Sequence, residues 1–249
     1  MSKRINVLGI GFDDITIDQA VSQACDMIHN DSNSYIVTPN PEIVWVCRNT
    51  EALTTAVNDA ALVLPDGIGI VIAARILGTP LNGGRVPGID FSAALLRKVA
   101  EINGSVFLLG AKPGIAEEAG NKLAAQFPGL RISGTADGYF SDVKPIIDQI
   151  NTAAPDLLFV CLGAPKQELW MSNYVKQLNV RLSVGLGGVL DVFAGRARRA
   201  PVFIQKLGFE WLYRLIRDPR RIKRSMRLPL FVLAVIWRRI SGNGDTCSI

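Results

Sequence analysis

The chain has 249 residues, of which 49% are hydrophobic and 20% charged, so it suits one large or two small globular domains and not a disordered chain. Its four cysteines lie far apart, which excludes a disulfide framework and favours a reducing compartment, and its single histidine, His29, argues against a zinc site or a histidine-dependent triad. The net charge of +5 conceals an asymmetry, because residues 1–195 hold 14 Lys/Arg against 19 Asp/Glu whereas residues 196–239 hold 13 against two.

The first half of the chain alternates short apolar runs with amphipathic stretches. An initial run at 6–10 is too short for a secretory signal and is predicted to form the first strand. Further strands are predicted at 34–37 and 61–64, and helices at 16–29, 42–48, 50–59, 68–77 and about 87–102. A loop rich in Gly and Pro, at 78–88, precedes the last of these helices.

The second half repeats the strand–helix alternation more regularly. Strands are predicted at 106–109, 131–135, 157–162 and 182–185, and helices at 115–127, 143–152 and 166–177. The strands are continuous apolar runs without period-two alternation, which is typical of a parallel sheet buried on both faces. We therefore expect an α/β fold with a Rossmann-like parallel sheet covered by helices on both faces.

The C-terminal part is basic and is predicted to form three short helices over about 201–240. Pro201, Pro219 and Pro229 each suit the first turn of a helix. The apolar run at 228–237 has ten residues, too few to span a bilayer as a helix, which needs about 20. Its flanking arginines suit a helix lying in a membrane interface, but burial against the body explains the run equally well. We expect an N-terminal α/β part at 1–103, a Rossmann-like part at 104–200 and a basic helical appendage at 201–249.

Distinctive residues follow the predicted strands, and ligands of such sheets bind beyond the carboxyl ends of the strands. These residues are Thr38, Asn40, Asp66, Gly110, Gln167 and, beyond Gly185–Gly188, Asp191. No loop carries a complete phosphate fingerprint, because each Gly-x-Gly lacks the third glycine and no P-loop motif occurs. Backbone N–H groups at helix N-termini can hold a diphosphate without such a fingerprint.

Asp66 is the most suggestive carboxylate in the sequence. It lies between Pro65 and Gly67, at the end of a buried strand and the start of a helix. A carboxylate held there is placed for general-base catalysis. The same location also suits a helix N-cap, and the local sequence leaves both interpretations open.

Eight runs along the chain carry a resemblance to one family. They are TPNPEIVWVCRN, LVLPDGIGIV, GGRVPGIDF, FLLGAKPGIAEEA, DGYF, FVCLGAPKQELWM, GLGGVLDVFAGRARRAP and GFEWLYRLIRDPRRIKR, in order over about 35–225. With them the chain resembles the WecG/TagA/CpsF family, glycosyltransferase family 26. The resemblance implies an inverting transferase that moves N-acetylmannosamine, its uronic acid or a hexose such as glucose. The donor would be a UDP-sugar and the acceptor a polyprenyl-diphosphate-linked saccharide, in cell-envelope or exopolysaccharide synthesis.

The resemblance also implies that 1–103 is the acceptor-side part, that 104–200 is the nucleotide-sugar part and that the appendage lies near the membrane. It implies roles for individual residues as well. Asp66 matches the catalytic base, and the acceptor pocket would include Thr38, Asn40 and Arg85. Nucleotide-sugar contacts would come from Gly110, Tyr139, Gln167 and Asp191. Arg214, Arg221 and Arg224 match residues that reach the substrate diphosphates. Together with Arg217 they are spaced by three or four positions, so on a continuous helix they would form one cationic stripe.

The residue types fit the implied chemistry. Inversion by single displacement needs a base and positive charge at the departing diphosphate. The sequence contains no Asp-x-Asp motif for a metal, so we expect a metal-independent enzyme without a cofactor. The expected partners are the UDP-sugar, the lipid-diphosphate-linked acceptor and the cytoplasmic face of the inner (plasma) membrane, where the protein would be peripheral; nucleic acid is not expected, and a homo-oligomer is left open.

Two other functions remain as alternatives. A Rossmann-type oxidoreductase would share the fold but is disfavoured by the incomplete glycine fingerprints. A non-enzymatic module that binds anionic lipid or nucleic acid would use only the basic end of the chain and would bind any polyanion in a salt-sensitive way.

Overall fold

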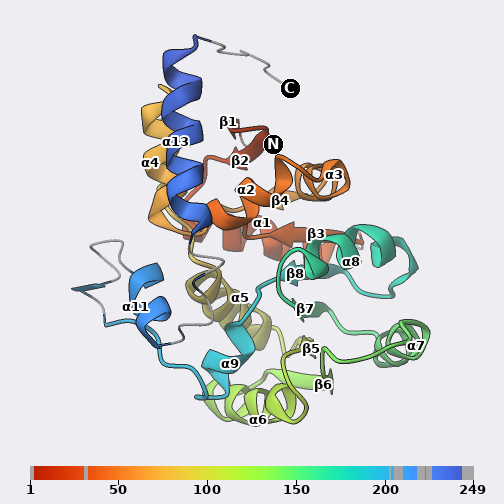
Figure 1. The fold of residues 1–249 in the computed structure, drawn as a ribbon. Helices are drawn as coiled ribbons and strands as arrows, with labels where there is room; N and C mark the ends of the chain where they lie inside the picture. The colour runs from red at the N-terminus through yellow and green to blue at the C-terminus, as the bar shows by residue number, and fades with distance from the viewer. Residues whose placement is uncertain are drawn as a thin grey trace.

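A six-stranded parallel sheet organises the computed structural model, which describes residues 3–30, 33–201, 203–204, 210–217, 222 and 226–242. The strands run in the order β4-β3-β8-β7-β5-β6 (Figure 1). Their bounds are β3 Ser34–Val37, β4 Leu62–Val63, β5 Ser105–Gly110, β6 Arg131–Ala136, β7 Leu157–Cys161 and β8 Leu182–Gly185. Strand β8 lies between β3 and β7 and so joins the first and second halves of the chain in one sheet. The predicted parallel α/β fold is confirmed.

Helices cover both faces of this sheet, and alternate strand residues point into two separate cores. One face packs against α1 Ile17–His29, α5 Gly88–Glu101, α6 Ile115–Gln126 and α9 Val189–Phe193. The other packs against α2 Pro41–Cys47, α3 Glu51–Asn58, α7 Lys144–Ala153 and α8 Lys166–Tyr174, which a short 3-10 turn at Val175–Gln177 follows. On β7, for example, Leu158 points into the core under α2, α3, α7 and α8, and Phe159 points into the core under α1, α5, α6 and α9; both are fully buried.

The N-terminal run forms a hairpin outside the main sheet, so the prediction of one strand at 6–10 was wrong. Strands β1 Arg4–Val7 and β2 Ile10–Asp13 pair in antiparallel register around Leu8 and Gly9. Both turn residues have positive φ, 54° and 95°, as a two-residue hairpin turn requires. Asp13 accepts a 2.8 Å hydrogen bond from the Val63 N–H through Oδ2, which attaches the hairpin to β4.

Local signals predicted most helix positions well. Helix α1 begins after Thr16, whose hydroxyl accepts from the Gln19 N–H at 3.3 Å while the Gln19 side chain accepts from the Thr16 N–H at 2.9 Å. Helix α4, Ile68–Ile76, ends one residue before its predicted limit. The five-residue helix α9 was not predicted, because it has fewer than two turns and so shows no readable periodicity.

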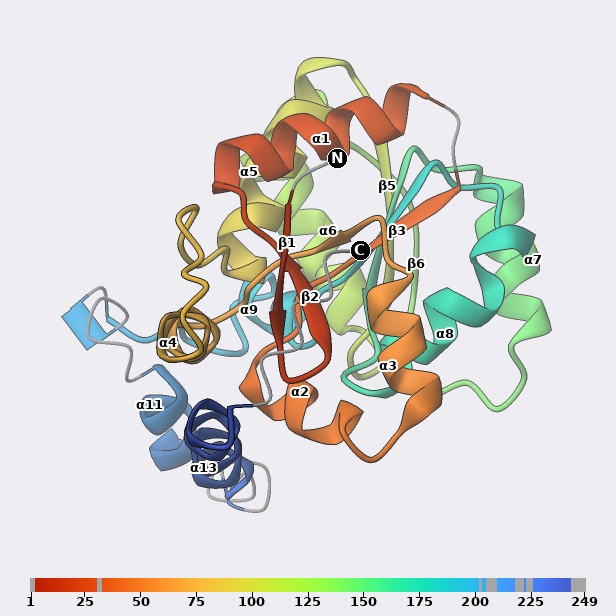
Figure 2. The same ribbon diagram turned by 90° about the horizontal axis from the view of Figure 1, so that it is seen from above.

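Two helices of the basic appendage fall within the described residues, α11 Glu210–Arg217 and α13 Arg227–Ile240. Helix α13 packs on α2 and α4, and Figures 1 and 2 show it alongside α4. The side chains of Phe231 and Val235 are 1% exposed at this contact. Pro229 lies in the first turn of α13, as predicted; Pro219 and its surroundings lie outside the described residues, so the prediction of three helices is tested only in part.

The opposite face of α13 remains open to solvent. Leu230, Leu233 and Trp237 are 44%, 62% and 72% exposed. The run at 228–237 therefore both packs on the body and presents an apolar surface, so neither sequence alternative excludes the other. Among the helices of the described ranges, none has the length and hydropathy needed to cross a bilayer.

Candidate active site

A small cavity lies where the loops following β4 and β8 meet the start of α5. Its volume is about 70 Å³, and it is lined by Asp66, Pro87, Gly88, Ile89, Leu186, Gly188, Val189, Val192, Arg199 and Glu210. The strands are parallel, so their carboxyl ends gather at one edge, where ligands of such sheets bind. Glu210 begins α11, and the appendage therefore contributes to this wall.

Asp66 lies on the cavity wall and is partly exposed. The N-cap of α4 is Gly67, with φ 96°, so the alternative interpretation of Asp66 as the cap residue is wrong. The backbone around it is held by the neighbouring loops: the Asp66 N–H donates to the Pro39 carbonyl at 3.3 Å, and the Val86 N–H donates to the Pro65 carbonyl at 2.9 Å. A carboxylate presented to a cavity on such a braced loop suits proton abstraction from a bound hydroxyl.

Thr38 and Asn40 are brought to the same edge but make structural hydrogen bonds. Thr38 is buried, and its hydroxyl donates to the Gly185 carbonyl at 2.9 Å, tying β3 to β8. It lies directly beneath Gly88, where an added Cβ would come within 3.3 Å of the Thr38 Oγ1. Asn40 caps α2, because its Oδ1 accepts from the Ile43 N–H at 3.1 Å.

Arg85 lies in the loop before α5, two residues before Pro87 of the cavity wall. It is partly exposed and makes no hydrogen bond or ion pair with another residue that the structure describes. A guanidinium in this state keeps its donors available for an anionic ligand.

Arg199 is a cavity residue that the sequence reasoning missed. Its Nη1 and Nη2 pair with the two oxygens of Asp90, in the first turn of α5, at 2.5 and 2.7 Å. This hydrogen bonding raises the pKa of Arg199, and the charges of Asp90, Glu210 and Asp66 act in the same direction. The run RARRAP contains three arginines, and nothing in it distinguishes the one that reaches this cavity.

A second candidate region lies where β5 and β7 end side by side. The connection from β5 runs through α6 to β6, and that from β7 runs through α8 to β8 on the other side. Ligands of doubly wound sheets bind at such a switch point. Gly110 is required there, because an added Cβ would lie 2.3 Å from the carbonyl oxygen of Cys161.

The segments that follow β6 and β7 contact each other at this switch point. Lys166 donates to the Gly138 carbonyl at 3.0 Å, and its Nζ lies 4.6 Å from the centre of the Phe140 ring. Tyr139 is 68% exposed on the loop after β6, with its N–H bonded to the Asp137 carboxylate at 2.8 Å. The exposed ring is available for stacking on a flat ligand.

Gln167 and Asp191 both lie close to the loop that follows β8. Gln167 is only 2% exposed, and its Oε1 accepts from the Gly187 N–H at 2.8 Å. Asp191 is in the first turn of α9, which also provides Val189 and Val192 of the cavity wall. Asp191 is partly exposed, whereas Gln167 supports the loop from behind.

The predicted cationic stripe is largely untested. Arg221 and Arg224 lie outside the described residues, and of Arg214 only the backbone, in α11, is described. Their role at the substrate diphosphates stays a prediction.

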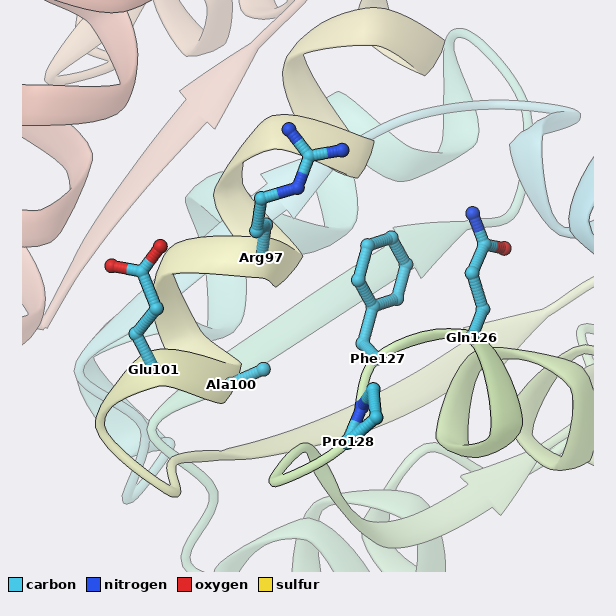
Figure 3. Close-up of a pocket in the computed structure, with 6 residues that line it drawn as sticks. All are labelled: Arg97, Ala100, Glu101, Gln126, Phe127 and Pro128. Atoms are coloured by element: carbon cyan, nitrogen blue, oxygen red, sulfur yellow. The ribbon is translucent and has the colours of Figure 1, made fainter.

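A larger hollow, of about 330 Å³, opens at the other edge of the sheet (Figure 3). Its walls come from the C-terminal ends of α5 and α6, just before β5 and β6 begin, and consist of Arg97, Ala100, Glu101, Gln126, Phe127 and Pro128. None of the predicted site residues borders it. The hollow therefore lies far from the loops at which ligands of this fold bind.

Within the described residues, no group of three or more His, Cys, Asp or Glu side chains could hold a metal ion. Burial raises the pKa of the free thiols Cys47 and Cys161 to about 12 each. Thiols so rarely ionised are poor nucleophiles.

Comparison with known proteins gives consistent matches. A family model described as "Glycosyl transferase WecG/TagA/CpsF family" matches residues 5–245. Three relatives share the name N-acetylglucosaminyldiphosphoundecaprenol N-acetyl-beta-D-mannosaminyltransferase. The protein of Bacillus spizizenii (strain ATCC 23059 / NRRL B-14472 / W23) is 36% identical over 209 residues, 84% of this chain and 81% of the relative. The protein of Staphylococcus aureus (strain MRSA252) is 36% identical over 236 residues, which are 93% of this chain and 92% of the relative. The protein of Bacillus subtilis (strain 168) is 36% identical over 201 residues, which are 81% of this chain and 78% of the relative.

Proposed function

Because the chain belongs to the WecG/TagA/CpsF glycosyltransferase family, we propose that it transfers N-acetylmannosamine from a UDP-sugar to a lipid-diphosphate-linked N-acetylglucosamine. The observation that carries this proposal is the identity of 36% along 93% of the chain to a relative named as an N-acetylmannosaminyltransferase that acts on N-acetylglucosaminyldiphosphoundecaprenol. A uronic acid or a hexose such as glucose is the alternative donor sugar. The product would serve cell-envelope or exopolysaccharide synthesis.

Asp66 is the proposed general base. It takes the proton from the acceptor hydroxyl as the hydroxyl oxygen bonds to the anomeric carbon of the donor. The bond from that carbon to the UDP oxygen breaks in the same step, so the configuration inverts and UDP leaves. Its position on the cavity wall, and the assignment of the helix cap to Gly67, support this role.

The proposed donor site is the switch point between β5 and β7. Gly110 lets the two strand ends approach closely, and the exposed ring of Tyr139 can stack on the uracil. The N-termini of α6 and α8 both open at this edge and offer N–H groups to a diphosphate. Asp191, in the first turn of α9, is a further proposed donor contact.

Arginines are the proposed counter-charge for the diphosphates, in place of a metal. Arg85, with its unengaged donors, lies two residues before Pro87 of the cavity wall, and Arg214, Arg221 and Arg224 would reach the substrate from the appendage. Guanidinium groups pair with phosphate oxygens through two N–H groups, which an ammonium cannot do. The double change Arg221→Lys with Arg224→Lys should therefore retain binding to anionic vesicles but turn over slowly. Full activity of that variant would reduce these arginines to membrane contacts.

The exposed face of α13 is the proposed membrane contact, and the protein would sit peripherally on the cytoplasmic face of the plasma membrane. Trp237 and Leu233 are exposed on a helix that ends with Arg238 and Arg239, a composition suited to a lipid interface. The buried face of α13 packs on α2 and α4, which begin at Pro41 and Ile68, immediately after the loops of Asn40 and Asp66. Contact at α13 would hold the cavity close to the lipid-linked acceptor.

The deciding experiment incubates the full chain with a panel of UDP-sugars and a short-chain lipid-diphosphate N-acetylglucosamine, read by mass spectrometry. We expect a mass increase of one N-acetylhexosamine with UDP-N-acetylmannosamine, with and without EDTA. Transfer from another UDP-sugar alone would correct the donor. Binding of NAD but not UDP would favour the oxidoreductase, and salt-sensitive binding of single-stranded DNA without turnover would favour the anion-binding module.

A further inference from the structure

Glu168 is a fully buried carboxyl group for which the proposed reaction has no use. It lies in the first turn of α8 and is 0% exposed. Its Oε1 accepts one hydrogen bond, from the Gln167 amide at 2.9 Å, and its Oε2 has no hydrogen-bond partner among the described residues. A carboxylate that is buried without a cation is costly, so such a group is kept neutral.

Its environment favours the neutral acid. Burial raises the pKa of Glu168, against smaller lowering effects of the hydrogen bonds from Gln167 and from its own backbone. No cation within the described residues takes part in this shift, and the nearby Cys47 thiol is itself un-ionised because its pKa is raised to about 12. The neutral acid still offers Oε1 as an acceptor to the Gln167 amide.

The Gln167 amide connects Glu168 to the 186–188 loop, because it hydrogen-bonds to both. Its Nε2 donates to Glu168, and its Oε1 accepts from the Gly187 N–H at 2.8 Å. A turn of the amide by 180° would set its Nε2 against the Gly187 N–H, donor against donor, and would lose the hydrogen bond to Gly187. Leu186 and Gly188, the neighbours of Gly187, line the cavity that contains Asp66.

We propose that Glu168 is a positioning residue, which orients the Gln167 amide and thereby holds the 186–188 loop in the shape that lines the Asp66 cavity. This proposal rests on the proposed glycosyl transfer for its effect on turnover, but its effect on the loop is independent of the reaction. This role does not need a negative charge on Glu168, because only its Oε1 is used, as a hydrogen-bond acceptor. It also differs from simple packing, because an apolar side chain of equal length cannot replace it.

The test compares Glu168→Gln, which keeps an acceptor oxygen, with Glu168→Met, which keeps the volume and removes the acceptor. Hydrogen exchange of the Gly187 amide, followed by NMR on the full chain, is read first. We expect about tenfold faster exchange in Glu168→Met and a change of less than about threefold in Glu168→Gln, from the worth of one hydrogen bond. The exposed Glu101→Gln, on the far edge of the sheet, is the matched control and should leave exchange and turnover unchanged.

Turnover is read second. Glu168→Met should lower kcat about tenfold with the KM for the UDP-sugar almost unchanged, since a displaced loop affects the alignment of reacting groups. If Glu168→Gln is as damaging as Glu168→Met, the ionised group is needed and the proposal is overturned. If Glu168→Met leaves Gly187 exchange unchanged, the contact does not position the loop, and the proposal is equally overturned.

A second variant covers the case in which Glu168→Met does not fold. Gln167→Met breaks the same chain of contacts from the other side, and it should expose the Gly187 amide to faster exchange with Glu168 intact. A protected Gly187 amide in this variant would overturn the proposal. If the wild-type chain transfers no sugar, the proposed function fails, while the Gly187 measurement still decides the role of Glu168.

Discussion

Replacement of Phe231 by alanine should release α13 from the body without unfolding the sheet. Phe231 and Val235 lie one turn apart on α13, are each 1% exposed, and belong to the core that includes α2 and α4. The ion pair of Arg227 with Glu42, at 3.7 Å and partly exposed, adds less than about 1 kcal/mol. The apolar contact therefore provides most of the attachment.

The magnitude follows from the burial of the two side chains. A fully buried Phe replaced by Ala costs about 3–5 kcal/mol, whereas full burial of Val235 contributes only about 1.5–3 kcal/mol. An isolated helix of 14 residues is marginal in water, so α13 has little stability once it is detached. We expect residues 227–240 to lose protection in Phe231→Ala, while the parallel sheet keeps its own.

Hydrogen exchange with mass spectrometry measures this directly, and Leu233→Ala is the matched control. Leu233 lies on the same helix but is 62% exposed, so its replacement should leave exchange over 227–240 unchanged. The same control should weaken sedimentation with anionic vesicles, because it removes apolar area from the proposed membrane contact. Equal protection in wild type and Phe231→Ala, or equal loosening by Leu233→Ala, would refute the assignment of the two faces.

Three further predictions address the site. Asp66→Asn should keep UDP affinity and lose about 10²- to 10⁴-fold in turnover, measured by product mass; near-normal turnover would require another base. Asp90→Arg or Arg199→Asp alone should lower the thermal midpoint of unfolding and the turnover. The double variant should show a coupling energy of about 1 kcal/mol between the two residues, measured by denaturant unfolding of all four proteins. If the two single changes in unfolding free energy simply add in the double variant, the two side chains do not form a stabilising pair. Burial raises the pKa of Glu168, so as the pH rises this group ionises in the unfolded chain before it ionises in the folded protein. The unfolding free energy of wild type, compared with that of Glu168→Gln, should therefore fall above about pH 4.5. If the difference between the two proteins does not change with pH, Glu168 is charged in the folded protein.

Local structure could be predicted wherever the signal lies within a few residues. The helix predicted at 16–29 is α1, whose start the capping box at Thr16 stabilises, and short apolar runs located β3 and β8 at their observed limits. The parallel arrangement of the strands, which the apolar runs predicted, brings the residues after β3, β4 and β8 to one edge of the sheet. Family membership likewise followed from motifs within the chain and is confirmed by the family match over 5–245.

Some features of the chain are local but ambiguous in the sequence. The N-terminal run reads as one strand because Leu8 gives no warning of its positive φ, which a non-glycine residue rarely adopts. Asp66 reads equally as cap or base, and only the backbone geometry at Gly67 assigns the cap elsewhere. In α13 the apolar run extends round the helix, so its hydrophobic pattern does not tell the face that packs from the face that stays exposed.

Other features depend on contacts between distant parts of the chain. Thr38 meets Gly185 across 147 positions, and Arg199 meets Asp90 across 109. Periodicity and local motifs report only on neighbours in sequence, so they give no sign of which arginine of RARRAP reaches the cavity. The same holds for Gln167 and Glu168: their burial, and the contact from Gln167 to the Gly187 amide, exist only because β8 inserts between β3 and β7 and brings its following loop against α8.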